Sequence, residues 1–201
     1  ATNAITGIAT AHMDSIPMVV LSGQVPSNLI GSDAFQETDM VGVSRPVVKH
    51  SFIVKHCSEI PLIVRKAFHI ATTGRPGPVV IDIPKDTTDP DILETYEFPK
   101  NIQMRSYNPV VEGNSKQIAK AAKQIFSSKK PIVYVGGGAV QSDASEELRA
   151  MATLLRVPVT NTLMGLGAFP GSDKQCLGML GMHGTYQANM AMHEADLIVA
   201  V

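Results

Sequence analysis

The segment from Gly74 to Asp86 constrains the fold of this chain more than any other. It reads Gly-Arg-Pro-Gly-Pro, then the apolar run 79–83, then Pro-Lys-Asp. The prolines at 76 and 78 exclude a helix here, and a branched run with few charges is typical of a parallel strand covered on both faces. Lys85 and Asp86 would follow the carboxyl end of that strand, where open α/β sheets bind their ligands.

The composition narrows the class of protein. The chain has 201 residues, 44% of them hydrophobic, which suits one or two packed domains. A net charge of -1 gives no basic surface for nucleic acid, and no apolar run approaches the roughly 18 to 20 residues that span a membrane. Cys57 and Cys176 lie far apart without metal-ligand spacing, so we expect neither a zinc site nor a disulfide, and a reducing, cytoplasmic compartment fits.

The order of helical and strand signals predicts an α/β chain in two parts. We expect one part over 1–86, a proline-rich surface linker over 87–114, and a second part over 115–201. In the first part we expect helices at 2–13, 37–43 and 58–73 and extended segments at 18–21, 49–54 and 79–83. In the second we expect helices at 115–127, 143–155 and 185–193 and strands at 132–135, 157–160 and 197–201, which predicts a doubly wound parallel sheet. Because the chain starts at Ala1 and stops within an apolar run, we expect it to be a piece of a longer chain.

Three glycines, Gly136, Gly137 and Gly138, end the predicted strand 132–135. Their backbone N–H groups could approach an anion, although the next helix is expected only near Asp143. The triplet is not a GxGxxG motif, and by itself it favours a tight turn with no ligand.

Two further glycine-containing segments combine backbone access with soft apolar side chains. They are Thr162-Leu163-Met164-Gly165 and Leu180-Gly181-Met182-His183. Such residues could form a wall for a flat ring system, or they could equally be core packing. A single imidazole such as His183 is more often a satisfied histidine than a ligand.

The loop from Gly31 to Glu37 carries two carboxylates. Asp33 and Glu37 could act as an acid/base pair, but we favour solvated or helix-capping roles. Phe35 and Gln36 together would suit a small substrate with one apolar end and one carbonyl. Lys85, considered alone, is more often a surface charge.

Several motifs together give the chain a resemblance to a known family. They are Ala1-Thr2-Asn3, Ser22-Gly23-Gln24-Val25-Pro26, Gly31 to Glu37, Gly74 to Asp86, Tyr134 to Gly138, Thr162 to Gly165 and Met179 to Thr185. On these residues the chain closely resembles, over its whole length, the catalytic large subunits of acetolactate synthases. This family belongs to the thiamine-diphosphate-dependent enzymes, which share the Gly-Arg-Pro-Gly-Pro segment widely, whereas the Ala-Phe-Gln-Glu loop is narrower.

The resemblance implies the C-terminal half of a pyrimidine-binding domain followed by the first part of an FAD-binding middle domain. It implies thiamine diphosphate, Mg2+ and FAD as cofactors, with FAD playing no net redox part. The family's catalytic glutamate would lie upstream of residue 1 and its metal motif downstream of residue 201, so no metal ligand is expected here. The chain alone is therefore not expected to catalyse.

The activity implied by the resemblance is the condensation of pyruvate with a second pyruvate or with 2-oxobutyrate, with loss of CO2. The products, 2-acetolactate and 2-aceto-2-hydroxybutyrate, are precursors of valine, leucine and isoleucine. The resemblance also implies a homodimer or tetramer of large subunits and a small regulatory subunit, and no nucleic-acid or membrane partner.

The resemblance implies site residues of two kinds. It places Ala34, Phe35 and Gln36 at the reaction centre, with Lys85 near the entry channel and Pro26 bordering it. It assigns to FAD the residues Ser15, Arg75, Gly136, Gly137, Gly138, Thr162, Leu163, Met164, Gly165, Leu180, Gly181, Met182 and His183. Two alternatives remain: another thiamine-diphosphate enzyme, such as glyoxylate carboligase or pyruvate oxidase, and a noncatalytic FAD-binding module, against which residues 1–86 argue.

Overall fold

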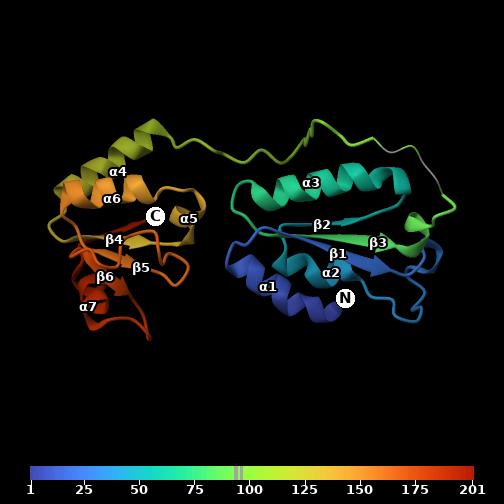
Figure 1. Cartoon of the computed structure of the whole chain (residues 1–201), viewed down its shortest axis with the longest axis horizontal. Coiled ribbons are helices and arrows are strands. Elements are labelled where there is room, and N and C mark those ends of the chain that lie inside the picture. Colours follow the sequence, from blue (N-terminus) through green and yellow to red (C-terminus); the bar gives the residue numbers. More distant parts are fainter. Residues whose placement is uncertain (93–94, 96) are drawn as a thin grey trace. The chain divides into compact units, whose positions relative to one another are not determined.

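The computed structural model describes residues 1–92, 95 and 97–201, and these form two compact units (Figure 1). The units comprise Ala1–Val111 and Glu112–Val201. Three positions of the expected linker, 93, 94 and 96, lie outside the described residues. No helix in the described part of the chain is both long and apolar enough to cross a membrane.

The first unit is a parallel three-stranded sheet in the order β1-β3-β2. Its strands are β1 (Met18–Gln24), β2 (His50–Ile53) and β3 (Pro78–Pro84). Helices α1 (Ile5–Met13) and α2 (Met40–Ser44) lie on one face of this sheet, and α3 (Ile60–Thr72) lies on the other (Figure 1). Short 3-10 turns occur at Thr2–Ala4, Ser27–Leu29, Arg45–Val47, Cys57–Glu59 and Lys85–Thr88.

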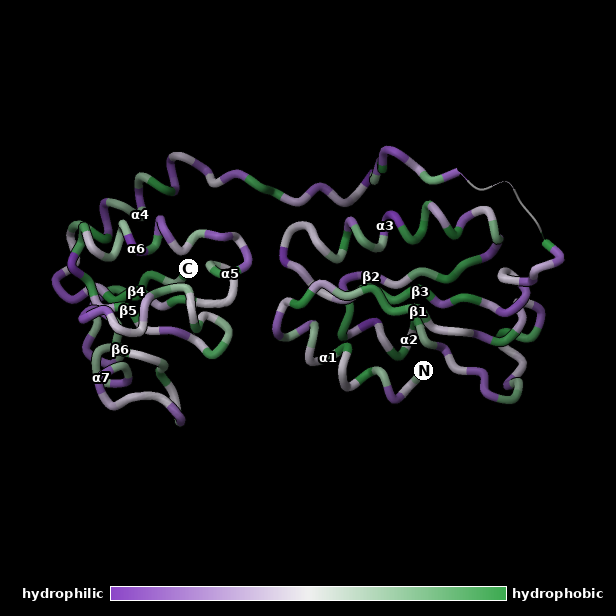
Figure 2. Tube along the Cα trace, viewed as in Figure 1, coloured by the Kyte–Doolittle hydropathy of each residue, from purple (hydrophilic) through white to green (hydrophobic). Residues whose placement is uncertain are grey.

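The middle strand β3 forms the core of the first unit, as its sequence predicts. Val79 and Ile81 face α3 and pack with Ala67 and its neighbours, whereas Val80 faces the other way and packs with Ile8 and Met40. Apolar side chains of this strand therefore pack on both faces of the sheet. The backbone trace in Figure 2 shows β3 as largely hydrophobic. Buried on both faces, β3 has a fixed register, and its carboxyl end is a rigid base for the residues that follow.

The second unit is a parallel four-stranded sheet in the order β6-β5-β4-β7. Its strands are β4 (Pro131–Val135), β5 (Val159–Asn161), β6 (Cys176–Met179) and β7 (Leu197–Ala200). Helices α4 (Ser115–Ser127) and α6 (Ser145–Leu155) lie on one side and α7 (Tyr186–Glu194) on the other (Figure 1). The doubly wound parallel sheet is confirmed, and its strand order reverses between β4 and β7, because β5 and β6 are added on one side of β4 and β7 on the other.

The structure corrects the expectation that the first helix after the glycine triplet begins near Asp143. The helix expected over 143–155 is present as α6, and a short helix that the sequence did not predict precedes it. Helix α5 (Gly137–Gln141) begins inside the glycine triplet, and Gly136 is its N-cap. A β-carbon on Gly137 would come within 3.0 Å of Met164 Cβ. The helix can start at Gly137 because glycine has no side chain to clash with the neighbouring loop that carries Met164. Helix propensity alone disfavours a helix start at glycine residues.

Strand β6 was not predicted. It has four residues, and Gly178 within it has a φ of +79°. A strand this short, interrupted by a glycine with left-handed backbone, shows no alternation of apolar and polar residues in the sequence.

Part of the segment expected to be a surface linker packs against the first unit. Met104 and Tyr107 contact the cluster formed by α3 and β3. The Tyr107 hydroxyl donates to Thr73 O at 2.8 Å and accepts from Lys49 Nζ at 3.1 Å. Lys49 Nζ also donates to the carbonyls of Ile70 and Thr73, so the last turn of α3 is capped by a lysine that the linker covers.

Candidate functional site

A polar cavity opens at the carboxyl end of the first sheet. Its volume is about 410 Å³, and it is lined by Ala1, Thr2, Ser22, Gly23, Gln24, Gln36, Thr38 and Met40. Of the residues predicted at the reaction centre, Gln36 is the one that lines it. Gln36 has a φ of +64°, an unusual backbone conformation for a residue with a side chain.

The carboxylate of Glu37 braces the loop that carries Gln36. It accepts hydrogen bonds from the backbone N–H of Gly31 and, at 2.8 Å, from that of Ala34. These bonds, the Gly31 bond first, hold the pKa of Glu37 below its usual value. The Glu37 side chain therefore stabilises the loop 31–37 by hydrogen bonds within that loop. Asp39, two residues later, caps α2 by accepting from Gly42 N.

A second set of contacts joins the same loop to the sheet. Gln24 Nε2 donates to the carbonyl of Thr38 at 2.6 Å and to Asp82 Oδ2 at 2.9 Å. Gln24 Oε1 accepts from Val25 N at 2.9 Å. We refer to Gln24, Asp82 and Thr38 as the Gln24 cluster.

Asp82 is a buried acid inside β3, with 1% of its surface exposed. Burial raises its pKa, and the negative charge of Asp39 adds to that, whereas the Gln24 amide and the Ser22 hydroxyl lower it. Ser22 is the cross-strand neighbour of Asp82. Ser22 Oγ and Asp82 Oδ1 lack a hydrogen-bond partner within the described residues, so the two groups are near one another but not in hydrogen-bond geometry. Asp82 is not among the predicted site residues, although a lone acid in an apolar strand is a recognisable signal.

Lys85 and Pro26 lie on adjoining loops at this same edge. Lys85, which is exposed, lines a second hollow of about 480 Å³ together with Gln24 and other residues of β1 and β3. Ser27, next to Pro26, donates to Asp86 Oδ1 from its backbone N–H at 2.8 Å and from its hydroxyl at 3.1 Å. The turn after β3 is thus joined to the loop after β1.

Ala34 and Phe35 belong to the braced loop but do not line the cavity with Gln36. Ala34 is half-buried, whereas 89% of the Phe35 side chain is exposed. A fully exposed aromatic ring is available for contact with another molecule.

Ser15 and Arg75 lie at the opposite edge of the first sheet, before β1 and β3. Arg75 Nε donates to Ser15 Oγ at 2.8 Å, and its Nη2 contacts the carbonyl of Met13 at 3.2 Å. Ser15 has a φ of +60°. The two residues assigned by resemblance to FAD are therefore in direct contact.

The FAD residues assigned to the second unit gather at the carboxyl edge of its sheet. Gly136, Gly137 and Gly138 follow β4, and the segment 162–165 follows β5. Thr162 N donates to Val135 O at 2.8 Å, and a β-carbon on Gly165 would come within 2.2 Å of the same oxygen. The two loops are in contact, next to the point where the strand order reverses and where such sheets bind dinucleotides.

The loop 180–184 follows β6 and is fixed by Asn189 of α7. Asn189 accepts from Gly181 N at 2.9 Å and donates to Gly181 O at 3.0 Å. Leu180 is half-buried, whereas His183 and Met182 are exposed, Met182 to 91%. Leu163 and Met164 in the neighbouring loop are also exposed. Soft apolar side chains therefore surround backbone N–H groups at this edge.

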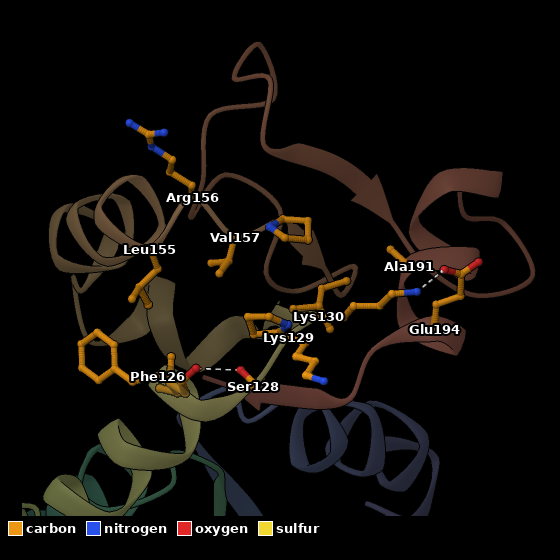
Figure 3. Close-up of a pocket in the computed structure, with 13 residues that line it drawn as sticks. Phe126, Ser128, Lys129, Lys130, Leu155, Arg156, Val157, Ala191 and Glu194 are labelled. Atoms are coloured by element: carbon orange, nitrogen blue, oxygen red, sulfur yellow. Dashed lines mark hydrogen bonds and ion pairs between the residues drawn. The ribbon is translucent and has the colours of Figure 1, made fainter.

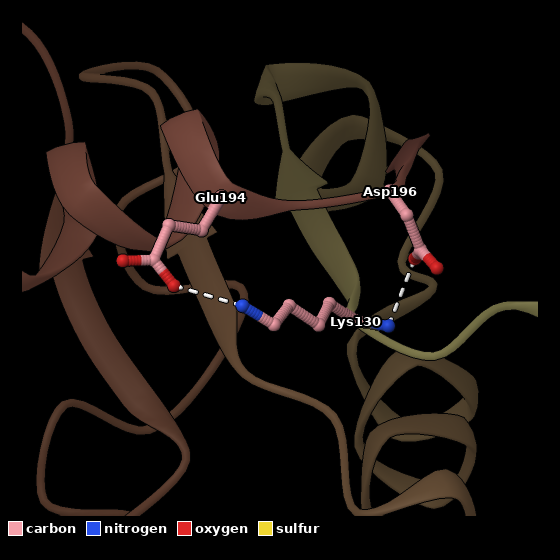
Figure 4. Close-up of polar contacts among 3 residues, drawn as sticks. All are labelled: Lys130, Glu194 and Asp196. Atoms are coloured by element: carbon pink, nitrogen blue, oxygen red, sulfur yellow. Dashed lines mark hydrogen bonds and ion pairs between the residues drawn. The ribbon is translucent and has the colours of Figure 1, made fainter.

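A cavity of about 540 Å³ in the second unit lies at the other edge of the sheet, before β4 and β5 (Figure 3). Phe126 and Leu155 contribute apolar surface there, and Lys130 Nζ forms an exposed 3.0 Å ion pair with Glu194. The backbone N–H of Lys130 donates to Asp196 at 2.8 Å (Figure 4). None of the predicted site residues lines this cavity. Within the described residues, no group of three or more His, Cys, Asp or Glu side chains could hold a metal ion.

Two families of known proteins match the chain, one in each of its two units. The family described as the N-terminal TPP binding domain of thiamine pyrophosphate enzymes matches residues 1–43, and the family described as their central domain matches residues 118–201. The chain belongs to the thiamine pyrophosphate enzymes. In this family the first unit corresponds to the N-terminal domain and the second to the central domain, consistent with the pyrimidine-binding and middle domains that the motifs predicted.

Individual relatives in the thiamine pyrophosphate enzyme family match the chain from end to end. The acetolactate synthase large subunit of Haemophilus influenzae is 63% identical over 201 residues, which are 100% of this chain and 35% of the relative. The acetolactate synthase isozyme 3 large subunit of Escherichia coli is 59% identical, again over 100% of this chain and 35% of the relative. A probable acetolactate synthase large subunit of Methanocaldococcus jannaschii is 51% identical over 100% of the chain and 34% of the relative. The chain spans about a third of the length of these relatives.

Proposed function

We propose that the full-length protein containing this chain is an acetolactate synthase large subunit. It would condense two molecules of pyruvate, or pyruvate and 2-oxobutyrate, with loss of CO2. The observation that carries this proposal is the 63% identity, over all 201 residues, to a relative of that name. The pathway would be the synthesis of branched-chain amino acids, and with both cysteines free the cytoplasm is the compartment that fits.

In this proposal the cavity at the end of the first sheet borders the reaction centre. Bound thiamine diphosphate supplies the electron sink for loss of CO2. The Gln36 amide offers both a donor and an acceptor to a 2-oxo acid, and its loop is held in place before substrate binds by Glu37 and the Gln24 cluster. Lys85, at the adjoining hollow, would attract the carboxylate of the incoming substrate.

FAD fits the carboxyl edge of the second sheet. A β-carbon on Gly138 would meet no atom within 4 Å, so the backbone at that position is open to a ligand. The N–H groups at the start of α5 would face the FAD diphosphate, while Leu163, Met164 and Met182 would contact its apolar ring system. The motif resemblance assigns Arg75 and Ser15 to FAD as well. We propose that Mg2+ is bound by parts of the full-length protein beyond this chain.

The proposed assembly is a homodimer or tetramer of large subunits with a small regulatory subunit. Support comes from the relatives, which are named large subunits, and from Phe35, whose exposed ring would be covered by a partner subunit. Light scattering of the purified full-length protein tests this, because an active monomer at micromolar concentration contradicts it.

The activity is tested on the purified full-length protein with thiamine diphosphate, Mg2+ and FAD. Pyruvate should yield acetolactate, detected as acetoin after acid treatment, and chain 1–201 alone should yield none. Glyoxylate in place of pyruvate is the matched control for a related carboligase. Product from glyoxylate but none from pyruvate would refute the proposal.

A further inference from the structure

Asp82 is the buried acid that the proposed reaction leaves unexplained. It lies in the centre of the first unit, and it does not line the cavity. Burying a carboxyl group among apolar side chains is unfavourable unless a polar partner compensates. Within the described residues, the hydrogen bond that its side chain accepts comes from Gln24 Nε2.

The orientation of the Gln24 amide is determined by its partners. Both hydrogens of Nε2 are used, one by Thr38 O at 2.6 Å and one by Asp82 Oδ2 at 2.9 Å, and Oε1 accepts from Val25 N. The reversed amide would place its oxygen against a carbonyl and a carboxyl group. By accepting one Nε2 hydrogen, Asp82 therefore fixes the direction in which Gln24 points the other hydrogen at Thr38 O.

The carbonyl that accepts this second hydrogen, Thr38 O, belongs to the loop at the cavity. Thr38 is two residues after Gln36, and its oxygen accepts from both Gln24 Nε2 and Met40 N. The loop is thus attached to the sheet at Thr38 and braced internally by Glu37. Gln36, between these two attachments, has the unusual backbone conformation that such attachments must maintain.

We propose that Asp82 is a positioning residue that acts through Gln24 to hold the Gln36 loop at the cavity. The proposal deepens the proposed acetolactate-forming function and rests on it for its kinetic consequences. Asp82 would touch neither substrate nor cofactor. Its role would be to keep the Gln36 amide where the reacting groups meet, since small displacements of such groups slow reactions strongly.

Four variants of the full-length holoenzyme test the proposal. Asp82→Leu removes the acceptor with a side chain that has the same number of heavy atoms, and Gln24→Met removes the donor with a side chain of similar volume. Both should lower kcat for acetolactate formation at least about tenfold while changing KM for pyruvate less than about threefold. Asp82→Asn keeps an acceptor oxygen and should stay within about threefold of the unchanged protein. The double variant Gln24→Met/Asp82→Leu should be no slower than the slower single variant, because both act through one contact.

Hydrogen exchange separates positioning from a general loss of stability. In Asp82→Leu and Gln24→Met, exchange should accelerate at least about tenfold in residues 29–39 and stay unchanged in α3, which packs on the same sheet, and in α6 of the second unit. If Asp82→Leu does not fold, Gln24→Met and Asp82→Asn carry the test.

Three results would overturn the proposal: unchanged kcat in Gln24→Met, a loss in Asp82→Asn as large as in Asp82→Leu, or faster exchange spread through α3 together with the loop. If the unchanged protein forms no acetolactate, the proposed function fails. The exchange comparison then still decides whether Asp82 holds the loop.

Discussion

Arg75 Nε donates a 2.8 Å hydrogen bond to Ser15 Oγ. This contact joins the turn after α1 to the segment before β3, across 60 positions of sequence. Arg75 also reaches the carbonyls of His12 and Met13, so its guanidinium satisfies the exposed end of α1. An exposed arginine fixed by three contacts is preorganised for an anionic ligand.

We predict that Arg75→Ala in the full-length protein lowers the amount of FAD retained through purification by about tenfold, a loss of one charge-assisted contact. Gln36→Ala should retain FAD and lose acetolactate formation instead. Flavin absorbance per protein and the acetoin assay measure the two effects. Arg149→Ala, at an exposed position of α6, is the control and should change neither. The reverse pattern for Arg75 and Gln36 would refute both assignments.

The order of the Gln36 loop should depend on pH through Glu37. Its pKa in the folded protein lies below the usual 4.5 because of the Gly31 and Ala34 backbone bonds. A lowered pKa means that the carboxylate stabilises the loop fully above about pH 4.5 and that this stabilisation is lost as the pH falls through the lower, folded value.

We therefore predict that protection of the Gly31 and Ala34 amides, corrected for intrinsic exchange, decreases as the pH falls below about 4.5. In Glu37→Gln the same amides should be less protected at neutral pH and show little pH dependence. Equal protection in both proteins at pH 7 would contradict this account of the loop.

Gly165→Ala should disrupt the second unit. The added β-carbon would lie 2.2 Å from Val135 O, a backbone atom of β4 that cannot move without disturbing the sheet. We expect a loss of about 2–4 kcal/mol in the stability of this unit and a loss of bound FAD. Gly171→Ala is the matched control, because a β-carbon there meets no atom within 4 Å. Thermal unfolding and flavin absorbance measure both; similar stability of the two variants would contradict the predicted contact.

Tyr107→Phe should loosen the linker segment from α3. The hydroxyl donates to Thr73 O and accepts from Lys49 Nζ and Thr73 Oγ1, so its removal takes one hydrogen bond from each of these part-buried groups. We expect a local cost of about 1–2 kcal/mol, seen as faster hydrogen exchange in the last turn of α3 and in residues 104–109. Tyr186→Phe, at a side chain that is 75% exposed, should leave exchange unchanged. No difference between the two variants would show that the Tyr107 hydroxyl is not needed.

The sequence determined the elements whose signals are local or strongly periodic. The helix predicted over 115–127 has those bounds in α4, and the apolar run 79–83 lies within β3. Proline and glycine at 74–78 end a helix and begin a strand because their backbone limits act on the chain itself. The motifs likewise indicated the thiamine pyrophosphate enzymes, because they are specific in residue type and order.

Only the tertiary structure decided which side chains meet. Helix α5 starts at Gly137 because the loop after β5 packs against it, and that approach has no signature near Gly137. Gln24, Thr38 and Asp82 come from three separate segments, and they contact one another because β1 and β3 pair in one register. A hydrogen bond between residues 58 positions apart depends on strand pairing and burial, which no local pattern of residue types records.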